Sequence, residues 1–169
     1  MLRHSAPCTK QLAYVTLIRP VLEYANIAWF PYVKNDVTML ESVQRKAVRF
    51  IFNRYRRTDS PTELLHLAGL PTLTNRAKVH RLKFLFELLN NSFKIDPLAF
   101  VSINRSRNTR HKHALTIKEF SCKNNAFLYS FFPLAVREWN KLDPVIAQQS
   151  SPENFTQLVE EALLWPNAE

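Results

Sequence analysis

The chain of 169 residues contains one glycine, Gly69, and this scarcity is the feature that most limits its fold. Glycine adopts positive φ angles without steric cost and lets a backbone approach a phosphate closely. Glycine-rich phosphate loops, dinucleotide-binding turns and the tight hairpins of β-barrels all depend on such positions. A single glycine cannot supply them, so the sequence disfavours nucleotide-loop enzymes and tight-turn β folds.

Apolar residues recur at helical spacing along most of the chain, which favours an all-α fold. The composition is compatible with a packed core, since 46% of the residues are hydrophobic and 12% are aromatic. We expect a small bundle of about five or six helices with a basic loop and a C-terminal helix. The expected helices cover residues 9–28, 35–51, 60–69, 74–90 and 132–142, with a final helix from Ser151 through Leu163 and the basic loop at 101–114.

Residues with known positional preferences mark the helix boundaries. Thr9 is the expected cap of the first helix, and Pro20 inside it predicts a bend or break near residues 16–19, because proline removes a backbone hydrogen bond. Asn35 or Asp36 is the expected cap of the second helix.

The clearest boundary signal in the chain is Ser60-Pro61-Thr62-Glu63. It predicts a helix with Ser60 as its cap, Pro61 at the first position and Glu63 completing a capping box, and Gly69 should end that helix. Ser151 is the expected cap of the last helix. Trp29 and Trp139 are expected to be core residues.

The chain is expected to form one main domain. We assign an N-terminal extension to residues 1–8, a helical domain to 9–142, and an acidic linker followed by the C-terminal helix to 143–169. The last of these ranges contains five Asp and Glu residues and no Lys or Arg. Cys8 and Cys122 are too far apart in sequence to suggest a disulfide framework, and an intracellular location, nuclear or cytoplasmic, suits them.

Positive charge is concentrated in three windows. The net charge is +9, and residues 45–57, 76–83 and 105–113 hold 6, 4 and 4 Lys or Arg residues without an acid. Such clustering indicates a polyanionic partner, and nucleic acid is the first hypothesis. The alternative is a solvated helix face that keeps the protein soluble, although such faces normally mix both charge signs.

Arginine dominates the first window and can hold a phosphate through two parallel hydrogen bonds. Arg45, Arg49 and Arg56 fall along one stripe if the second helix continues that far, and Arg76 and Lys83 share an outer face of a later helix. The predicted nucleic-acid-binding residues are Arg45, Arg49, Arg56, Arg57, Arg76, Lys83, Arg105, Arg107 and Arg110.

The acidic residues argue against catalysis. Two-metal phosphoryl transfer needs several converging carboxylates, whereas the chain has no Asp-Asp pair. Glu23 and Glu41 are expected on helix surfaces or in ion pairs. His111 and His113, with Cys122, could suggest zinc, but neighbouring cations oppose a metal ion and a fourth ligand is lacking. We therefore expect no catalytic residue, metal or cofactor, and no membrane span, because no apolar run reaches 18 residues.

Three blocks stand out in the sequence: residues 17–25 (LIRPVLEYA), followed by Trp29 and Pro31, residues 40–49 (LESVQRKAVR) and residues 130–142 (SFFPLAVREWNKL). Together they resemble the region after the polymerase palm in jockey-type non-LTR retrotransposon reverse transcriptases, particularly arthropod copies. Their order and spacing fit from about Pro7 to Pro144. The chain departs from the family where Asp143 stands before Pro144, since the family usually has proline directly after the leucine.

The resemblance implies a part of an RNA-directed DNA polymerase that primes from a nicked chromosomal end. It places residues 9–53 in the thumb and the segment after it, beside the primer-template duplex, with the fingers, palm and metal-binding Asp-Asp motif before Met1 and therefore missing. On this basis we expect a catalytically incomplete fragment that binds a nucleic-acid backbone without sequence preference, and whose partner in a longer polyprotein is the palm. The alternatives are a truncated transposon remnant without autonomous function and a helical protein-interaction module.

Overall fold

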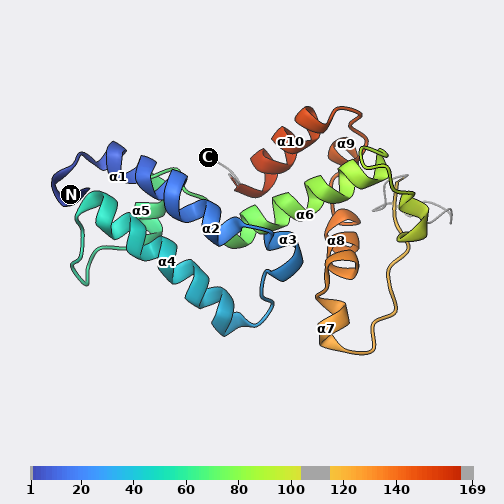
Figure 1. Cartoon of the computed structure of the whole chain (residues 1–169), viewed down its shortest axis with the longest axis horizontal. Coiled ribbons are helices and arrows are strands. Elements are labelled where there is room, and N and C mark those ends of the chain that lie inside the picture. The colour runs from blue at the N-terminus through green and yellow to red at the C-terminus, as the bar shows by residue number, and fades with distance from the viewer. Residues whose placement is uncertain (1, 104–114, 165–169) are drawn as a thin grey trace. The chain divides into compact units, whose positions relative to one another are not determined.

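The computed structural model describes residues 2–103 and 115–164 and is all-α, as predicted (Figure 1). Extended pairing in these two ranges is limited to one antiparallel bridge, between Ile103 and Ile117. The chain divides into two compact units, Met1–Ala77 and Lys78–Glu169. This division falls inside α6 and differs from the sequence-based one, which placed residues 9–142 in a single domain.

The described residues of the first unit form five complete α-helices of unequal length and the start of a sixth, together with short helical turns. A 3-10 turn covers Leu2–His4, and a π-helical segment connects the first two α-helices. The elements are α1 (Pro7–Ala13), the π-helical segment (Tyr14–Ile18), α2 (Arg19–Glu23), the single turn α3 (Asn26–Trp29), α4 (Lys34–Phe52), α5 (Pro61–Leu67) and the start of α6 (Leu73–Leu89).

Pro20 distorts the first helix where the sequence predicted a bend or break. The N–H of Arg19 donates to the carbonyl of Tyr14, five residues back, so the helix widens by one residue just before the proline. This widening accommodates a residue that lacks its own N–H. The predicted start is wrong, because Ala6 occupies the cap position and Pro7 the first turn, which leaves Thr9 inside the helix.

The start of α4 differs from the prediction, whereas its last residue, Phe52, lies one position beyond the predicted end at Ile51. Val33 holds the cap position, so Asn35 and Asp36 lie in the first turn. There the positive end of the helix dipole stabilises the Asp36 carboxylate. The helix stops at Asn53, whose φ of 53° lies in the left-handed region, and the N–H of Arg54 donates to the carbonyl of Arg49 at 3.0 Å. The predicted helical stripe therefore ends before Arg56.

The predicted boundaries of α5 are confirmed. The Ser60 hydroxyl accepts a hydrogen bond from the Glu63 N–H at 3.4 Å, and proline follows the cap. Gly69 has a φ of 59°, its N–H donates to the carbonyl of His66, and the N–H of Leu70 donates to the carbonyl of Leu65. These two bonds form the C-terminal capping arrangement of a helix in which a residue with positive φ, usually glycine, follows the last turn.

Buried polar groups connect the helices of the first unit around an apolar cluster. The Tyr14 hydroxyl donates to Gln44 at 2.9 Å, and the Gln44 amide donates to the Pro71 carbonyl at 2.8 Å. The Glu41 carboxylate accepts from the N–H and the hydroxyl of Thr74, at 3.0 and 2.9 Å, and so caps α6. The apolar cluster consists of Tyr14, Val48, Ile51, Leu64, Ala68 and Leu70.

Trp29 is not a core residue, although the sequence suggested that it would be. Its side chain is 44% exposed, and its indole N–H donates to the Tyr24 carbonyl. The prediction failed because the helix is interrupted at Ala25, which has a φ of 50°, and restarts as the short α3. This interruption changes the direction of the helix before Trp29 is reached.

Burial of Tyr14 predicts a pH-dependent stability of the first unit. Tyr14 is 3% exposed, and desolvation raises its pKa from 10.0 to about 12. Between pH 10 and 12 the unfolded state loses this proton first, so stability falls as the pH rises. We expect Tyr14→Phe to be less stable than the native chain below pH 10, and urea unfolding should show the difference shrinking by about 2–3 kcal/mol toward pH 12. A constant difference would contradict this assignment.

The second unit contains the rest of α6 and a set of shorter helices. A 3-10 turn covers Pro97–Ala99. The α-helices are α7 (Asn125–Leu128), α8 (Phe131–Trp139), α9 (Pro144–Ala147) and α10 (Pro152–Leu164). The expected linker at 143–150 therefore contains a helix, because Asp143 accepts from the Val145 N–H at 2.8 Å and proline fills the first position.

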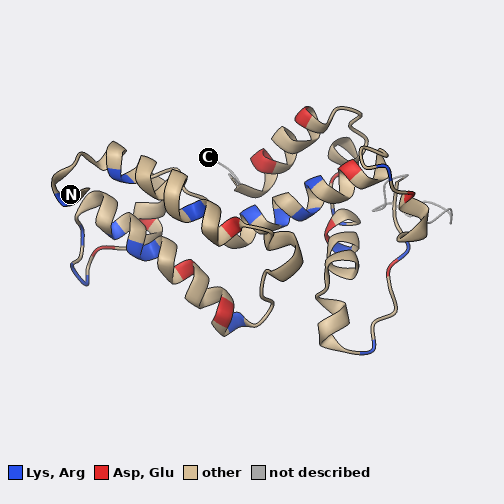
Figure 2. Ribbon diagram, in the orientation of Figure 1, with Lys and Arg blue, Asp and Glu red and all other residues tan. Residues whose placement is uncertain are grey.

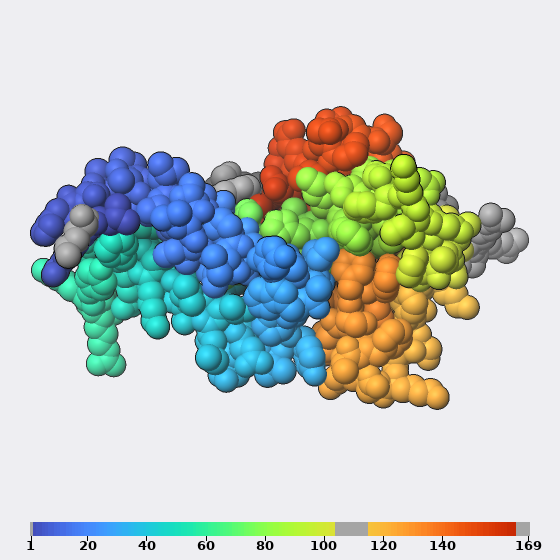
Figure 3. Space-filling view, viewed as in Figure 1, coloured from blue at the N-terminus to red at the C-terminus, as the bar shows by residue number. Residues whose placement is uncertain are grey.

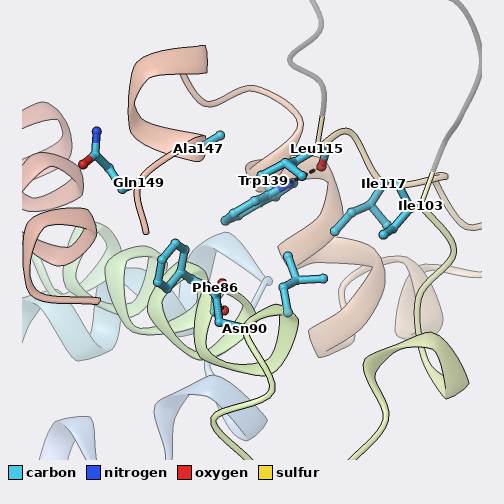
Figure 4. Close-up of a pocket in the computed structure, with 9 residues that line it drawn as sticks. Phe86, Asn90, Ile103, Leu115, Ile117, Trp139, Ala147 and Gln149 are labelled. Atoms are coloured by element: carbon cyan, nitrogen blue, oxygen red, sulfur yellow. Dashed lines mark hydrogen bonds between the residues drawn. The ribbon is translucent and has the colours of Figure 1, made fainter. Parts of the chain in front are cut away.

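Aromatic side chains form the core of the second unit. Trp139 is 1% exposed, as predicted for a core residue, and Phe86 stacks on Phe155 with ring centroids 4.1 Å apart. Phe155 and Val159 of α10 belong to the same buried cluster as Trp139, so the C-terminal region is an integral part of this core. A cavity of about 120 Å³ lies in this core. Figure 4 shows the side chains that line it, among them Trp139, whose indole N–H donates to the Leu115 carbonyl at 2.9 Å.

That cavity has an apolar character. Asn90 and Gln149 are the polar side chains among its lining residues, all of which the structure describes, and none of its lining side chains is ionisable. The Asn90 amide donates to the Phe86 carbonyl at 3.0 Å. The cavity therefore offers packing surface but no acid, base or nucleophile.

Candidate nucleic-acid interface

Exposed cations gather at the C-terminal half of α4 and in the turn after it. Figure 2 shows a basic position at the very start of α4, acidic positions after it and further basic positions toward its end. The acids are Asp36 and Glu41, and the cations of the second half are Arg45, Lys46 and Arg49. The positive charge thus lies where the negative end of the helix dipole favours it.

The packing of α4 determines which way its arginines point. The buried side chains of the helix, including Gln44, Val48 and Ile51, face the core. Arg45 is exposed and Arg49 is half-buried, and their i, i+4 spacing places them one turn apart on the same outer face. The predicted pair Arg45 and Arg49 therefore shares one surface.

The turn after α4 carries the remaining cations of this window. Arg54, Arg56 and Arg57 are exposed, and the Arg56 backbone N–H donates to the Asp59 carboxylate at 2.8 Å. This bond fixes the turn through the backbone of Arg56. We use the name α4 basic surface for Arg45, Lys46, Arg49, Arg54, Arg56 and Arg57.

Ion pairs hold other cations of the chain. Within residues 2–103 and 115–164 they join Arg19 and Arg76 to Glu23, and Arg81 to Glu138. None of the three pairs includes a member of the α4 basic surface. Its charge is therefore available to a partner in solution.

Arg76, a predicted binding residue, lies in a different electrostatic setting. Its guanidinium group pairs with both carboxylate oxygens of Glu23, with Nη2 3.0 Å from Oε2. Arg19 approaches the same carboxylate at 3.9 Å. Glu23 thus fulfils the ion-pair role expected for it, and much of the positive charge of Arg76 is offset.

Lys83, another predicted binding residue, lies beside acids of the second unit. It lines a groove between α6 and α10 together with Glu87, Glu153 and Glu160. The Ser151 hydroxyl that donates to Glu153 lowers the pKa of that carboxyl, and Lys83 acts in the same direction. These carboxylates would repel a phosphate near Lys83.

The other predicted binding residues lie outside the part of the chain that the structure describes. They are Arg105, Arg107 and Arg110. The α4 basic surface of the first unit is therefore the candidate binding surface.

Sequence analysis missed the role of Lys10. Its side chain is buried at the end of α4, and its ammonium donates to the Phe50 carbonyl at 3.3 Å and to Asn53 Oδ1 at 2.9 Å. The same ammonium lies 4.8 Å from the centroid of the Phe50 ring. A lysine near a helix start gives no sequence signal for such a contact, because its partners are about 40 residues away.

Residues 2–103 and 115–164 contain neither a cluster of potential metal ligands nor a helix that could span a membrane. No group of three or more His, Cys, Asp or Glu side chains in these ranges could hold a metal ion. In the same ranges, no helix combines the length and the apolar character needed to cross a bilayer.

The α4 basic surface is thus the candidate site that the described residues present. Comparisons with protein-family models, with curated proteins and with solved structures found no match to the chain.

Proposed function

We propose that the α4 basic surface binds the phosphate backbone of a nucleic-acid duplex without reading its sequence. In this proposal the chain corresponds to the thumb and post-polymerase region of a non-LTR retrotransposon reverse transcriptase, the family that its three sequence blocks resemble. Guanidinium groups contacting phosphates position a duplex, whereas base edges carry the sequence information. The surface would hold a primer-template duplex in place while another part of the polymerase copies it.

One observation carries this proposal: the six cations of the α4 basic surface lie on an ordered helix and its adjoining turn, outside the ion pairs found among the described residues. Five of the six are arginines, which suit bidentate phosphate contacts. A face that served only solubility would be expected to carry acids among its cations. Residues 45–57 contain none.

The proposed role is binding without nucleotide transfer. Three carboxylates that could be considered for metal binding are engaged in the fold: Glu23 pairs with arginines, Glu41 caps α6 and Glu138 pairs with Arg81. Phosphoryl transfer by two metal ions requires carboxylates that converge on them. We propose that the purified chain adds no nucleotide to a primer.

Exposed apolar side chains on the first helices favour a second candidate, a helical protein-interaction module. Leu12, Leu17 and Val21 are all well exposed. Such a module would bring its basic surface to an acidic partner while covering these side chains. A comparison of duplex with acidic peptide separates the two candidates.

The salt dependence of binding tests the proposed function. We expect two duplexes of unrelated sequence to bind with similar affinity and with a log–log salt slope of about −3.5 to −5.5, as expected if four to six phosphate contacts release counterions. Fluorescence anisotropy between low and physiological salt measures both quantities. A preference for one duplex, or a flat salt response, would contradict backbone binding. Equal binding of an acidic peptide would favour the interaction module.

A further inference from the structure

We propose that the hollow at the end of the α4 basic surface receives the base of one unpaired nucleotide, so that the site prefers a duplex carrying a single-stranded overhang. This inference rests on the proposed function and specifies its substrate. The hollow has a volume of about 560 Å³ and is lined by Arg3, His4, Phe50, Asn53 and Tyr55. Figure 3 shows the N-terminal residues and the end of α4 together at one end of this unit.

The aromatic part of the hollow suits stacking. Tyr55 is 62% exposed and directly follows Arg54 of the α4 basic surface. The Phe50 ring is half-buried and already has the Lys10 ammonium against it. Tyr55 is therefore the ring that can offer an open face to a base, and stacking on an aromatic side chain tolerates any base.

Asn53 adds a hydrogen-bond donor at the same place. Its amide oxygen already accepts from the Lys10 ammonium at 2.9 Å. This bond assigns the oxygen to the interior and leaves the amide NH2 group as the donor that Asn53 can offer to the hollow. Ring nitrogens and carbonyl oxygens on the edges of bases accept such bonds.

Positive charge borders the aromatic ring. Arg3 is exposed on the N-terminal 3-10 turn, and Arg54 and Arg56 flank Tyr55 in sequence in the turn after α4. A nucleotide whose base stacks on Tyr55 would thus have its phosphate near positive charge. The combination of an aromatic face, an amide donor and cations on one hollow matches the chemistry of a nucleotide better than that of a bare anion.

The requirement for an unpaired nucleotide follows from geometry. A base inside a duplex has both faces covered by its neighbours, so a protein ring reaches it only after unstacking, which costs a few kcal/mol. A base in an overhang has no such cost. Asn53 and Tyr55, which line the hollow, alternate in sequence with Arg54 and Arg56 of the α4 basic surface, so the duplex and the overhang can be held together.

Competitive anisotropy with three probes tests the inference: a blunt duplex, the same duplex with a short overhang, and that duplex with an abasic overhang, which keeps the phosphates and lacks the bases. We expect the native chain to bind the normal overhang about tenfold more tightly than the blunt and abasic probes. Tyr55→Ala should abolish this preference and leave blunt-duplex binding unchanged. Tyr55→Phe should retain the preference, because the ring remains.

Tyr24→Ala is the matched control, because Tyr24 is 79% exposed in the same unit and lies outside the lining of the hollow. It should leave all three affinities unchanged. Circular dichroism confirms that each variant is folded. Equal binding of normal and abasic overhangs, or a preference that survives in Tyr55→Ala, would overturn the inference while leaving duplex binding in place. Failure of every probe to bind would overturn the proposed function as well.

Discussion

Replacing Arg45, Arg49 and Arg56 together with glutamate is expected to lower the affinity for a blunt duplex by about 100-fold or more at low salt. In the proposed mode of binding, each substitution removes a phosphate contact and places a negative charge beside the polyanion. The effect should shrink as salt is added, because counterions screen the repulsion. Anisotropy titrations over a range of salt concentrations measure the loss. The log–log salt slope of the variant should be shallower by about 2.7, the contribution of three phosphate contacts.

A matched variant separates the position of the charges from their number. Lys118, Lys123 and Lys141 are exposed cations of the second unit. Their replacement by glutamate changes the net charge by the same amount as the arginine variant. We expect it to reduce duplex affinity only slightly. If both triple variants lost affinity equally, binding would reflect the net charge of the chain, and the α4 basic surface would have no special role.

Local sequence rules predicted the parts of the fold that depend on neighbouring residues. Ser60 and Gly69 marked the two ends of α5, and Pro20 marked the distortion of the first helix, because each acts on the backbone within a few residues. The periodicity of residues 74–90 matched α6 to within one residue at each end. An all-α fold followed from such signals without any knowledge of long-range contacts.

The sequence did not signal which non-glycine residues take left-handed conformations. Ala25 interrupts the first helix, which was not predicted, and Asn53 and Asn91 follow the ends of α4 and α6 with positive φ angles. An asparagine tolerates this region, but most asparagines do not adopt it, so the sequence alone left open whether α4 continues to Arg56. The candidate site changed accordingly from one helical stripe to a helix and its adjoining turn.

Partners far apart in sequence were the other source of error. The sequence identified Arg76 as a cation on a helix surface, but its partner Glu23 lies 53 residues away. The acids around Lys83 belong in part to α10, about 70 residues later. The clustering of cations along the sequence therefore identified the basic window at 45–57. Only the structure shows that distant acids offset the charges of Arg76 and Lys83.

The block at 130–142, which carries part of the family resemblance, serves the fold of the second unit. Arg137 donates to the Leu128 carbonyl at 2.7 Å, and Trp139 donates to the Leu115 carbonyl. The Asn140 side chain makes two hydrogen bonds to the backbone of Ile117. Its amide oxygen accepts from the Ile117 N–H at 3.0 Å, and its amide nitrogen donates to the Ile117 carbonyl at 2.8 Å. Its polar residues hold neighbouring segments in place, as an architectural motif would.

Glu138 has a large expected effect on stability within this block. It pairs with Arg81 through two hydrogen bonds, of 3.0 and 2.8 Å, and the side chains are 15% and 7% exposed. Removing one partner of a buried pair leaves the other charge without compensation. We expect Glu138→Leu to destabilise the second unit by about 3–5 kcal/mol. Urea unfolding by circular dichroism and hydrogen exchange in α6 and α8 measure the loss.

A double-mutant cycle attributes that loss to the charge left behind. Combining Arg81→Met with Glu138→Leu replaces the pair by apolar groups of similar size, which is often close to neutral in other proteins. The double variant should therefore recover most of the stability that Glu138→Leu loses. Glu119→Leu, at an exposed position of the same unit, should change stability by less than about 0.5 kcal/mol. If the double variant were as unstable as the sum of its two single variants, the two residues would act independently, and the ion pair would not be what holds α6 against α8.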